Sequence, residues 1–378
     1  MRNLSELLRL YDLRPGDIIH IDAGTYVITD EILITALDAG VTLRGPDASV
    51  GVALFDRANR DTGTAVFRIQ GADDVTLENL HVTGADIGIV VEASSGFTLR
   101  GSMVFENRSR GLFVDTLSPG AVVENNEFYG VGEDAERDQT FQIRVEGNDH
   151  LITGNTVYLT GIANFSVFAS NTGIYSRATT QMTVSGNTVF NVKTGFNVAA
   201  NMGDVSGNLA RDNWRGFSLT GNTSTSYLQV FDNVADDNQE IGFLLFEYVE
   251  TYGNLARQND IGMSRSGTTF SPTRMGTDDG RGGNVIAFNR IGINPGRSSI
   301  VQNNVIYGNT EDGIYLPGLS SAQILGNRIY SNGNFGIGSA TSGNNNQQFQ
   351  TIIENNLVYD NGNGGISYFA GNGSDGNP

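Results

Sequence analysis

Short apolar runs with the alternation of β-strands recur along almost the whole chain, and a polar turn follows each of them. The first four runs are Ile18–Ile21, Tyr26–Ile28, Ile32–Ile34 and Val41–Leu43, and they are rich in β-branched residues. Gly, Asp and Thr separate the runs, as is typical of turns between strands. From residue 17 onward the pattern therefore predicts strands and turns.

The first sixteen residues follow a different period. Leu4, Leu7, Leu8 and Tyr11 recur at helical spacing, and Pro15 ends the pattern. Residues 1–16 are therefore predicted to hold one short amphipathic helix, which would cap the open edge of the first strands.

A repeat is visible when the Asn or Gly that follows an apolar strand is aligned along the chain. These positions recur every 20 to 32 residues, at Asn79, Gly101, Asn126, Asn155, Asn187, Asn208, Asn233, Asn254, Asn284, Asn304, Asn327 and Asn356. Stacked coils about 4.8 Å apart would place equivalent residues above one another. Buried amides in such a column can bond the neighbouring backbone, so we predict an asparagine ladder.

A second anchor, Gly followed by an apolar residue, occurs in most repeats. Examples are Gly111-Leu112, Gly173-Ile174, Gly216-Phe217 and Gly242-Phe243. Glycine at this corner is expected to supply a positive φ. Two anchors per repeat predict an all-β fold, a right-handed parallel β-helix of about a dozen coils over residues 17–368, followed by a Gly/Asn-rich tail or linker at 369–378.

Coils of 29 to 32 residues exceed the minimum coil and are expected to carry loops, which are the first places to look for function. They fall at 130–150, 159–180, 270–283 and 338–350. The tail has too few apolar residues to cover a sheet edge. We therefore expect the C-terminal edge to continue into another domain or to contact a partner.

Charge narrows the choice of partners. The formal net charge is −18, and Lys193 is the one lysine among 23 basic residues, so nucleic acid is not expected to bind. No apolar stretch has the length of a membrane span, so membrane insertion is not expected either. Cysteine is absent, which removes thiolate chemistry.

Several segments resemble known β-helix enzymes. Pro15-Gly16-Asp17, together with residues 22–26, is similar to the first coil of bacterial pectate-lyase-like β-helix proteins. Residues 205–217 and 230–243 resemble coils of mannuronan C-5 epimerases and related alginate-active enzymes. The resemblance implies a secreted or cell-surface bacterial protein and an acidic polysaccharide as its ligand. The Pro-His-Glu part of the epimerase motif is missing from Gly111–Asp115 and Gly173–Arg177, so no mechanism is implied.

Alternate residues after the second anchor are expected to face solvent on one sheet. They bring together five candidate catalytic residues between the longest coils: Asp115, Arg144, Tyr175, Arg177 and Asn197. A lyase or epimerase must neutralise a uronate carboxylate and remove the adjacent C5 proton. Arg144 and Arg177 are suited to hold the carboxylate, with Tyr175 as the proton-transferring group and Asn197 polarising the acid.

Other residues are weaker candidates. Substrate contacts are expected from Glu92, Trp214, Arg215, Phe246 and Tyr315. Acidic loop residues suit calcium, the only cofactor that the sequence suggests, with candidate ligands Asp134, Asp138, Asp278 and Asp279. His150 ends a charged insertion and is expected to be an exposed loop residue.

Three hypotheses follow, and the sequence leaves open whether the protein is an enzyme. The first is binding or modification of a uronate polysaccharide such as alginate or pectin, by β-elimination or C5-epimerisation if catalytic. The second is a non-catalytic module of a large secreted or surface protein, serving as a spacer, adhesin or matrix component. The third is a glycoside hydrolase with Glu92 and Asp115 as its two carboxylates.

Overall fold

The computed structural model describes residues 4–132, 134–161, 171–267, 271–317, 321–339 and 351–367. The predicted tail at 369–378 and parts of all four insertions lie outside the described residues. Over the described parts, every third strand belongs to the same sheet, which gives three parallel sheets of 14 strands, here A, B and C. The predicted all-β, right-handed parallel β-helix is confirmed. Contacts within the chain define two compact units, Met1–Gly203 and Asp204–Pro378.

The first unit starts with helix α1 (Leu4–Leu10), which packs against the first strand of sheet C. Sheet A contains β1 (Ile18–His20), β4 (Thr42–Arg44), β7 (Thr76–Glu78), β10 (Thr98–Arg100), β13 (Val122–Glu124), β16 (His150–Thr153) and β19 (Gln181–Ser185). Sheet B contains β2 (Gly24–Val27), β5 (Ala53–Asp56), β8 (Leu80–Thr83), β11 (Met103–Phe105), β14 (Glu127–Val131), β17 (Thr156–Thr160) and β20 (Thr188–Phe190). Sheet C contains β3 (Ile32–Thr35), β6 (Ala65–Gln70), β9 (Ile87–Glu92), β12 (Arg110–Val114), β15 (Phe141–Glu146), β18 (Thr172–Arg177) and β21 (Thr194–Ala200). A short 3-10 helix, η1 (Ala36–Asp38), follows β3.

The second unit repeats the arrangement without a helix among its described residues. Its part of sheet A starts with β22 (Met202–Ser206), whose first two residues belong to the first unit. The strands that follow in sheet A are β25 (Leu228–Phe231), β28 (Val249–Tyr252), β31 (Thr273–Met275), β34 (Ser299–Gln302), β37 (Gln323–Leu325) and β40 (Ile352–Glu354). Sheet B contains β23 (Leu209–Arg211), β26 (Val234–Asp236), β29 (Leu255–Arg257), β32 (Val285–Ala287), β35 (Val305–Tyr307), β38 (Arg328–Tyr330) and β41 (Leu357–Tyr359). Sheet C contains β24 (Arg215–Gly221), β27 (Ile241–Leu245), β30 (Ile261–Arg265), β33 (Ile291–Asn294), β36 (Ile314–Leu316), β39 (Phe335–Ser339) and β42 (Gly364–Ser367).

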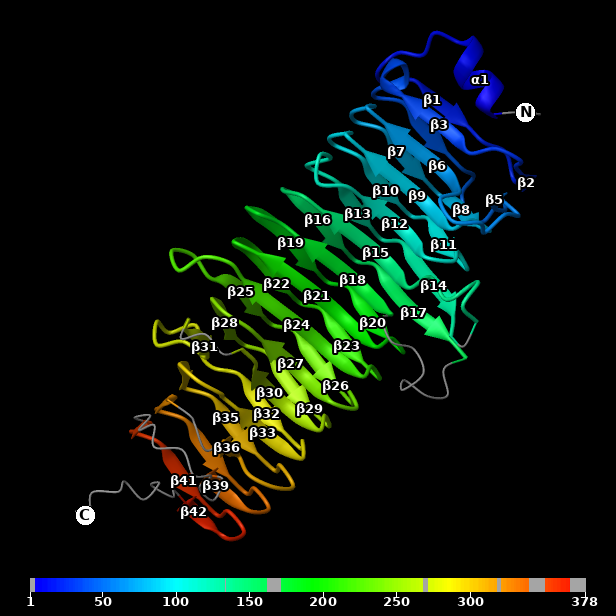
Figure 1. Ribbon diagram of the computed structural model, residues 1–378. Coiled ribbons are helices and arrows are strands. Elements are labelled where there is room, and N and C mark those ends of the chain that lie inside the picture. Colours follow the sequence, from blue (N-terminus) through cyan, green and yellow to red (C-terminus); the bar gives the residue numbers. More distant parts are fainter. Residues whose placement is uncertain are drawn as a thin grey trace. The chain divides into compact units, whose positions relative to one another are not determined.

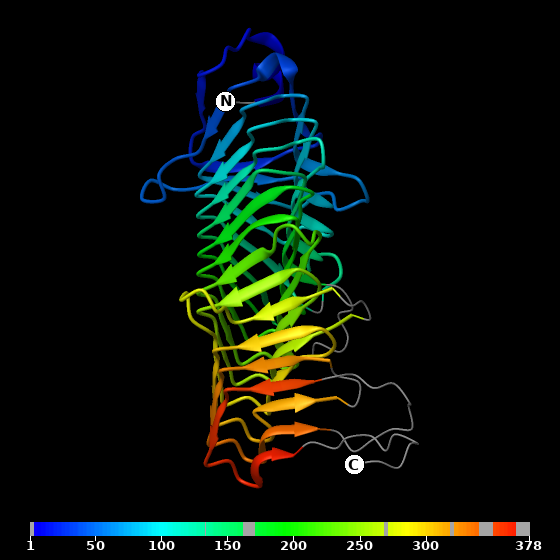
Figure 2. The ribbon, with the colours of Figure 1, turned by 90° about the vertical axis from the view of Figure 1, so that its left-hand side faces the viewer.

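Each coil contributes one strand to each sheet, so consecutive coils stack in chain order. Figure 1 shows this order for β7, β10 and β13, and Figure 2 shows the blue-to-green coils of the first unit as parallel layers. Inward-facing residues align from coil to coil, as Leu43, Leu77 and Leu99 do in sheet A, and all three are fully buried. The core is therefore a set of apolar columns.

The predicted asparagine ladder is present in both units. In the first unit, the amide nitrogen of Asn126 donates to Oδ1 of Asn155 at 3.0 Å and to the Leu99 carbonyl at 2.9 Å. A second, unpredicted ladder lies at the turn before sheet C and in the second unit includes Asn213, Asn238 and Asn259. Both ladders provide hydrogen-bond partners for buried backbone groups at the turns, where the strands leave these groups unpaired.

The prediction for the second-anchor glycines was wrong. Gly111 and Gly242 do not have a positive φ. A Cβ on Gly242 would instead lie 2.7 Å from the Gly262 carbonyl oxygen of the next coil, and a Cβ on Gly111 would lie 2.5 Å from the Gln142 carbonyl oxygen. Close stacking of coils, and not backbone strain, therefore requires glycine at these two positions.

Candidate functional site

The outer face of sheet C in the first unit brings together most of the predicted catalytic residues. Strand register aligns Phe113 of β12 with Arg144 of β15, Arg144 with Tyr175 of β18, and Tyr175 with Asn197 of β21. The next outward-facing position aligns Glu146 with Arg177. Of the predicted set, Arg144, Tyr175, Arg177 and Asn197 are thus neighbours on adjacent strands. We name this surface, from β6 to β21, the C face.

Arg144 lies at the centre of the C face. Its guanidinium carbon is 5.7, 5.1 and 5.2 Å from the ring centroids of Phe113, Phe141 and Tyr175, distances at which a cation is attracted to an aromatic ring. Its Nε and Nη2 also donate to Glu146 at 2.8 and 2.5 Å. Arg144 is therefore already held by three rings and a carboxylate.

Arg110 and Phe141 are members of the site that the sequence analysis missed. Arg110 is half-buried at the start of β12, with its guanidinium carbon 4.7 Å from the Phe113 ring centroid. Burial, followed by the charge of Arg144, lowers the pKa of Arg110. Both residues directly precede the corner, which is Gly111 in β12 and Gln142 in β15, and the predicted outward alternation begins only after it. A charged or aromatic residue directly before that corner is the signal that would have found them.

Asp115 lies just beyond the end of β12, and the turn engages its carboxylate. The carboxylate accepts hydrogen bonds from Ser118 Oγ at 2.6 Å, from the Leu117 amide at 3.1 Å and from the Ala93 amide at 3.2 Å. Glu92 ends β9 and pairs with Arg68 at 3.1 Å. Both carboxylates of the hydrolase hypothesis therefore already have protein partners.

The remaining substrate-binding candidates lie in the second unit. Arg215 starts β24 next to Trp214, and its Nη2 is 3.1 Å from a carboxylate oxygen of Glu240. Phe246 follows β27, and Tyr315 lies within β36, both half-buried.

The candidate calcium ligands do not converge on one point. Asp134 accepts from Arg137 Nε at 2.7 Å, Asp138 is buried beside Thr140, and Asp279 pairs with Arg281 at 2.7 Å. Asp278 is exposed beside Asp279. Within the described ranges, no group of three or more His, Asp or Glu side chains is placed to hold a metal ion.

His150 is not an exposed loop residue, which corrects the prediction. It begins β16 with 2% of its surface exposed, and its Nδ1 accepts from the Ala121 amide at 3.1 Å. Its neighbour in the next coil is Met182, so it occupies a core column. Burial lowers the pKa of His150 to about 4, so the neutral ring is a structural group at physiological pH.

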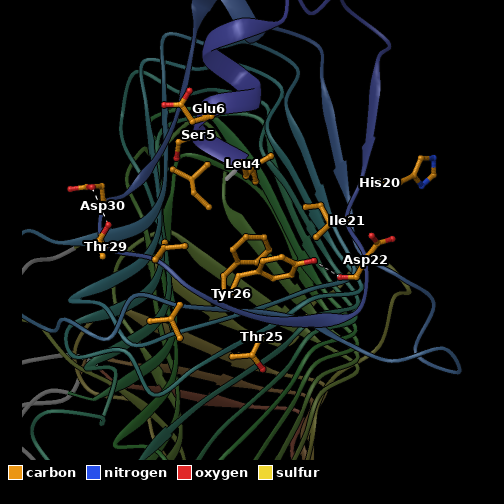
Figure 3. A pocket seen from close by; sticks show the side chains of 14 residues that line it. Leu4, Ser5, Glu6, His20, Ile21, Asp22, Thr25, Tyr26, Thr29 and Asp30 are labelled. Atoms are coloured by element: carbon orange, nitrogen blue, oxygen red, sulfur yellow. Dashed lines mark hydrogen bonds between the residues drawn. The ribbon is translucent and has the colours of Figure 1, made fainter. Parts of the chain in front are cut away.

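A cavity of about 810 Å³ lies between α1 and the first coil (Figure 3). Tyr26 and Phe55 stack there with ring centroids 5.0 Å apart, while Glu6, Asp22 and Asp30 contribute carboxylates to the lining. Neither arginine nor lysine lines it. An acidic ligand is therefore better suited to the C face than to this cavity.

The fold and the sequence together define the class of protein. The family model described as "right handed beta helix region" matches residues 88–261 and 281–377, more than half of the chain. The chain therefore belongs to this right-handed β-helix family.

Solved structures of similar fold have different activities. The chain is similar to the mannuronan C-5 epimerase AlgE4 A-module of Azotobacter vinelandii, at 14% identity over 94% of this chain and 90% of that one, with a TM-score of 0.46. It is also similar to pectate lyase Pel9A, at 15% identity over 95% and 74% of the two chains, with a TM-score of 0.32. PfbA, a surface adhesin of Streptococcus pneumoniae, has 11% identity over 85% of each chain and a TM-score of 0.44. No curated protein matches the sequence.

No helix in the described residues is both long enough and apolar enough to span a bilayer.

Proposed function

We propose that this protein binds a uronate-containing acidic polysaccharide, such as alginate or pectin, on the C face of the first unit. The observation that carries the proposal is the local charge. In the first unit, the strands of sheet C contain four arginines and two glutamates. Those of sheet A contain two arginines and two glutamates, and those of sheet B contain two acids and neither arginine nor lysine. Within the strands of the first unit, sheet C is therefore the sheet with an excess of arginine over acid, in a chain of net charge −18.

The side chains of the C face match the two chemical aspects of a uronate sugar. Guanidinium groups pair with carboxylates through parallel N–H donors. The rings of Phe113, Phe141 and Tyr175 offer apolar surface to the C–H faces of a sugar. A secreted or cell-surface location, where such polymers occur, belongs to the same proposal.

For a catalytic version of the proposal, Tyr175 is the proton-transferring group. It lies between Arg144 and Asn197 on adjacent strands, so a uronate held by the arginines would place its C5 proton near the phenol. Removal of that proton would then lead to β-elimination of the 4-oxygen or to reprotonation on the other face. In both reactions the cation and the amide stabilise the charge on the acid group.

A binding module without catalysis is the second candidate, and the internal pairing of the site favours it. Arg144 is held by Glu146, Glu92 by Arg68, and Asp115 by turn amides. A site whose central charges are already neutralised can contact a polymer without performing proton transfer.

The test incubates the protein with alginate, poly-mannuronate, pectate and hyaluronan, with neutral dextran as the polymer control. Binding is measured by calorimetry, elimination by absorbance of the unsaturated product, and C5 inversion by NMR. We expect Arg177→Gln to weaken acidic-polymer binding by about tenfold, because an interfacial charge pair is lost. Tyr175→Phe should abolish any product while retaining binding.

Arg44→Gln is the matched control, because Arg44 lies on sheet A, where it pairs with Glu78. Binding without product would select the module over the enzyme. Failure of all four acidic polymers to bind would overturn the proposed function.

A further inference from the structure

Two arginines of the C face differ from the others in having no carboxylate partner. Among the described residues, Arg68 pairs with Glu31 and Glu92, and Arg144 pairs with Glu146. Arg110 and Arg177 form no ion pair within that part of the chain, and the buried Nε of Arg110 has no hydrogen-bond partner there. Their charges are therefore available to an anion from solution.

Strand register fixes how far apart these two arginines lie. Arg110 of β12 aligns with Phe141 of β15, which aligns with Thr172 of β18, so Arg110 and Arg177 are two strand spacings apart. Arg177 also lies five residues beyond Thr172 on the same strand. Spacings of about 4.8 Å between strands and about 3.3 Å per residue place the two Cα atoms about 19 Å apart, on a diagonal across the face.

The surface between the two arginines is neutral and largely aromatic. It holds the Arg144–Glu146 pair together with the rings of Phe141 and Tyr175, which lie with their centroids 5.7 Å apart. A ligand group above this middle region meets ring surface and an arginine that is already paired. Each end of the diagonal instead offers a guanidinium that forms no ion pair with the described residues. One carboxylate cannot reach both ends.

We propose, on the basis of the function proposed above, that the C face selects ligands by length: an oligo-uronate must span the diagonal so that separate carboxylates pair with Arg110 and Arg177. Arg110 is then a specificity-determining residue. Once one carboxylate is bound, the second pairs intramolecularly, so affinity rises abruptly at the spanning length. Half-burial of Arg110 increases its contribution to the binding free energy, because a bound anion restores part of the solvation that the guanidinium has lost.

The experiment measures dissociation constants for uronate oligosaccharides that increase by one sugar at a time. The polymer used is the one that binds best in the panel described above. The wild-type protein should show a step of about tenfold or more at one length, with smaller changes before and after it. Arg110→Gln and Arg177→Gln should each remove the step and leave the affinity for the shortest oligomers within about twofold. The double variant should bind oligomers of every length more weakly than either single variant, because it has lost both arginine–carboxylate pairs.

Two further variants keep the proposal falsifiable. Arg110→Lys retains the charge and should retain the step, and Arg44→Gln on sheet A should leave the whole length series unchanged. Circular dichroism melting curves establish that each variant is folded. A smooth length dependence in the wild type, or a step that survives in Arg110→Gln, would overturn the length proposal while polymer binding still stands. Absence of binding by every polymer would instead remove the proposed function.

Discussion

At the scale of single residues, burial decides what the titratable groups do. His150 and Asp138 lie in neighbouring parts of the first unit, with 2% and 7% of their surfaces exposed. Burial lowers the pKa of His150 to about 4 and raises that of Asp138 to about 6. Each group is held in its neutral form over part of the pH range, and the two therefore affect stability with opposite signs.

For His150 we expect stability to fall in acid. Between about pH 6.5 and pH 4 the unfolded chain binds a proton that the folded protein does not, so the contribution is complete above pH 6.5 and is lost as pH falls toward 4. The full effect is about 3 kcal/mol. In His150→Asn the side-chain oxygen can still accept a hydrogen bond from the Ala121 amide, but the side chain does not titrate. The free energy of unfolding of this variant should therefore fall less steeply between pH 6.5 and pH 4 than that of the wild type. Chemical denaturation at several pH values measures the slope, and equal slopes would contradict the assignment.

For Asp138 the sign is reversed. The folded protein holds the proton more tightly than the unfolded chain between about pH 3.8 and pH 6, so stability from this group is present below that range and is lost as pH rises through it. Asp138→Asn removes the ionisation and retains a hydrogen-bond acceptor for Thr140. We expect the variant to gain about 3 kcal/mol over the wild type at pH 7 and little at pH 4. A thermal melting series at both pH values measures the difference, and a gain of the same size at both would contradict it.

At the scale of elements, the asparagine ladder carries much of the order between coils. In the second unit, Asn233 is fully buried, and its amide nitrogen donates to the carbonyl oxygens of Val205 and Phe231 and to Oδ1 of Asn254. Its Oδ1 accepts from the backbone amide of Asn208. One side chain thus satisfies groups in three successive coils.

We expect Asn233→Ala to lower the free energy of unfolding by about 2 to 4 kcal/mol, because it leaves several buried groups unpaired at once. Asn222, an exposed residue in the same unit, provides the control. Asn222→Ala should change stability by no more than about 0.5 kcal/mol. Urea denaturation of both variants gives the comparison, and similar losses would contradict a special role for the ladder.

The elements also show which features the sequence could predict. Stacked coils repeat the same environment, so apolar strands and asparagine turns recur in sequence, and both predictions were confirmed. The predicted cluster of Arg144, Tyr175, Arg177 and Asn197 is present because simple alternation holds after the glycine corner. At the corner itself Gly111 and Leu112 are both buried in succession, which shifts the alternation. Because of that shift, alternation counted from the later positions does not place Arg110 and Phe141 on the outer face.

At the scale of the whole molecule, net charge is a poor guide to a single surface. The chain carries −18, yet within the first unit the strands of sheet C contain more arginine than acid. Which arginines are free depends on partners 20 to 40 residues away, as the pairs Arg44–Glu78 and Arg68–Glu31 illustrate. Composition alone contains no information on such pairing.

The stacking of coils through shared amides also has a mechanical consequence. Within the second unit, neighbouring coils are joined by hydrogen bonds in three sheets and by two asparagine ladders, all oriented along the stacking direction. A force applied along that direction acts on all the hydrogen bonds between two neighbouring coils at once. The same force is then transmitted to the next pair of coils. Stretched between its ends, this unit should therefore extend in discrete steps, each releasing one coil of chain.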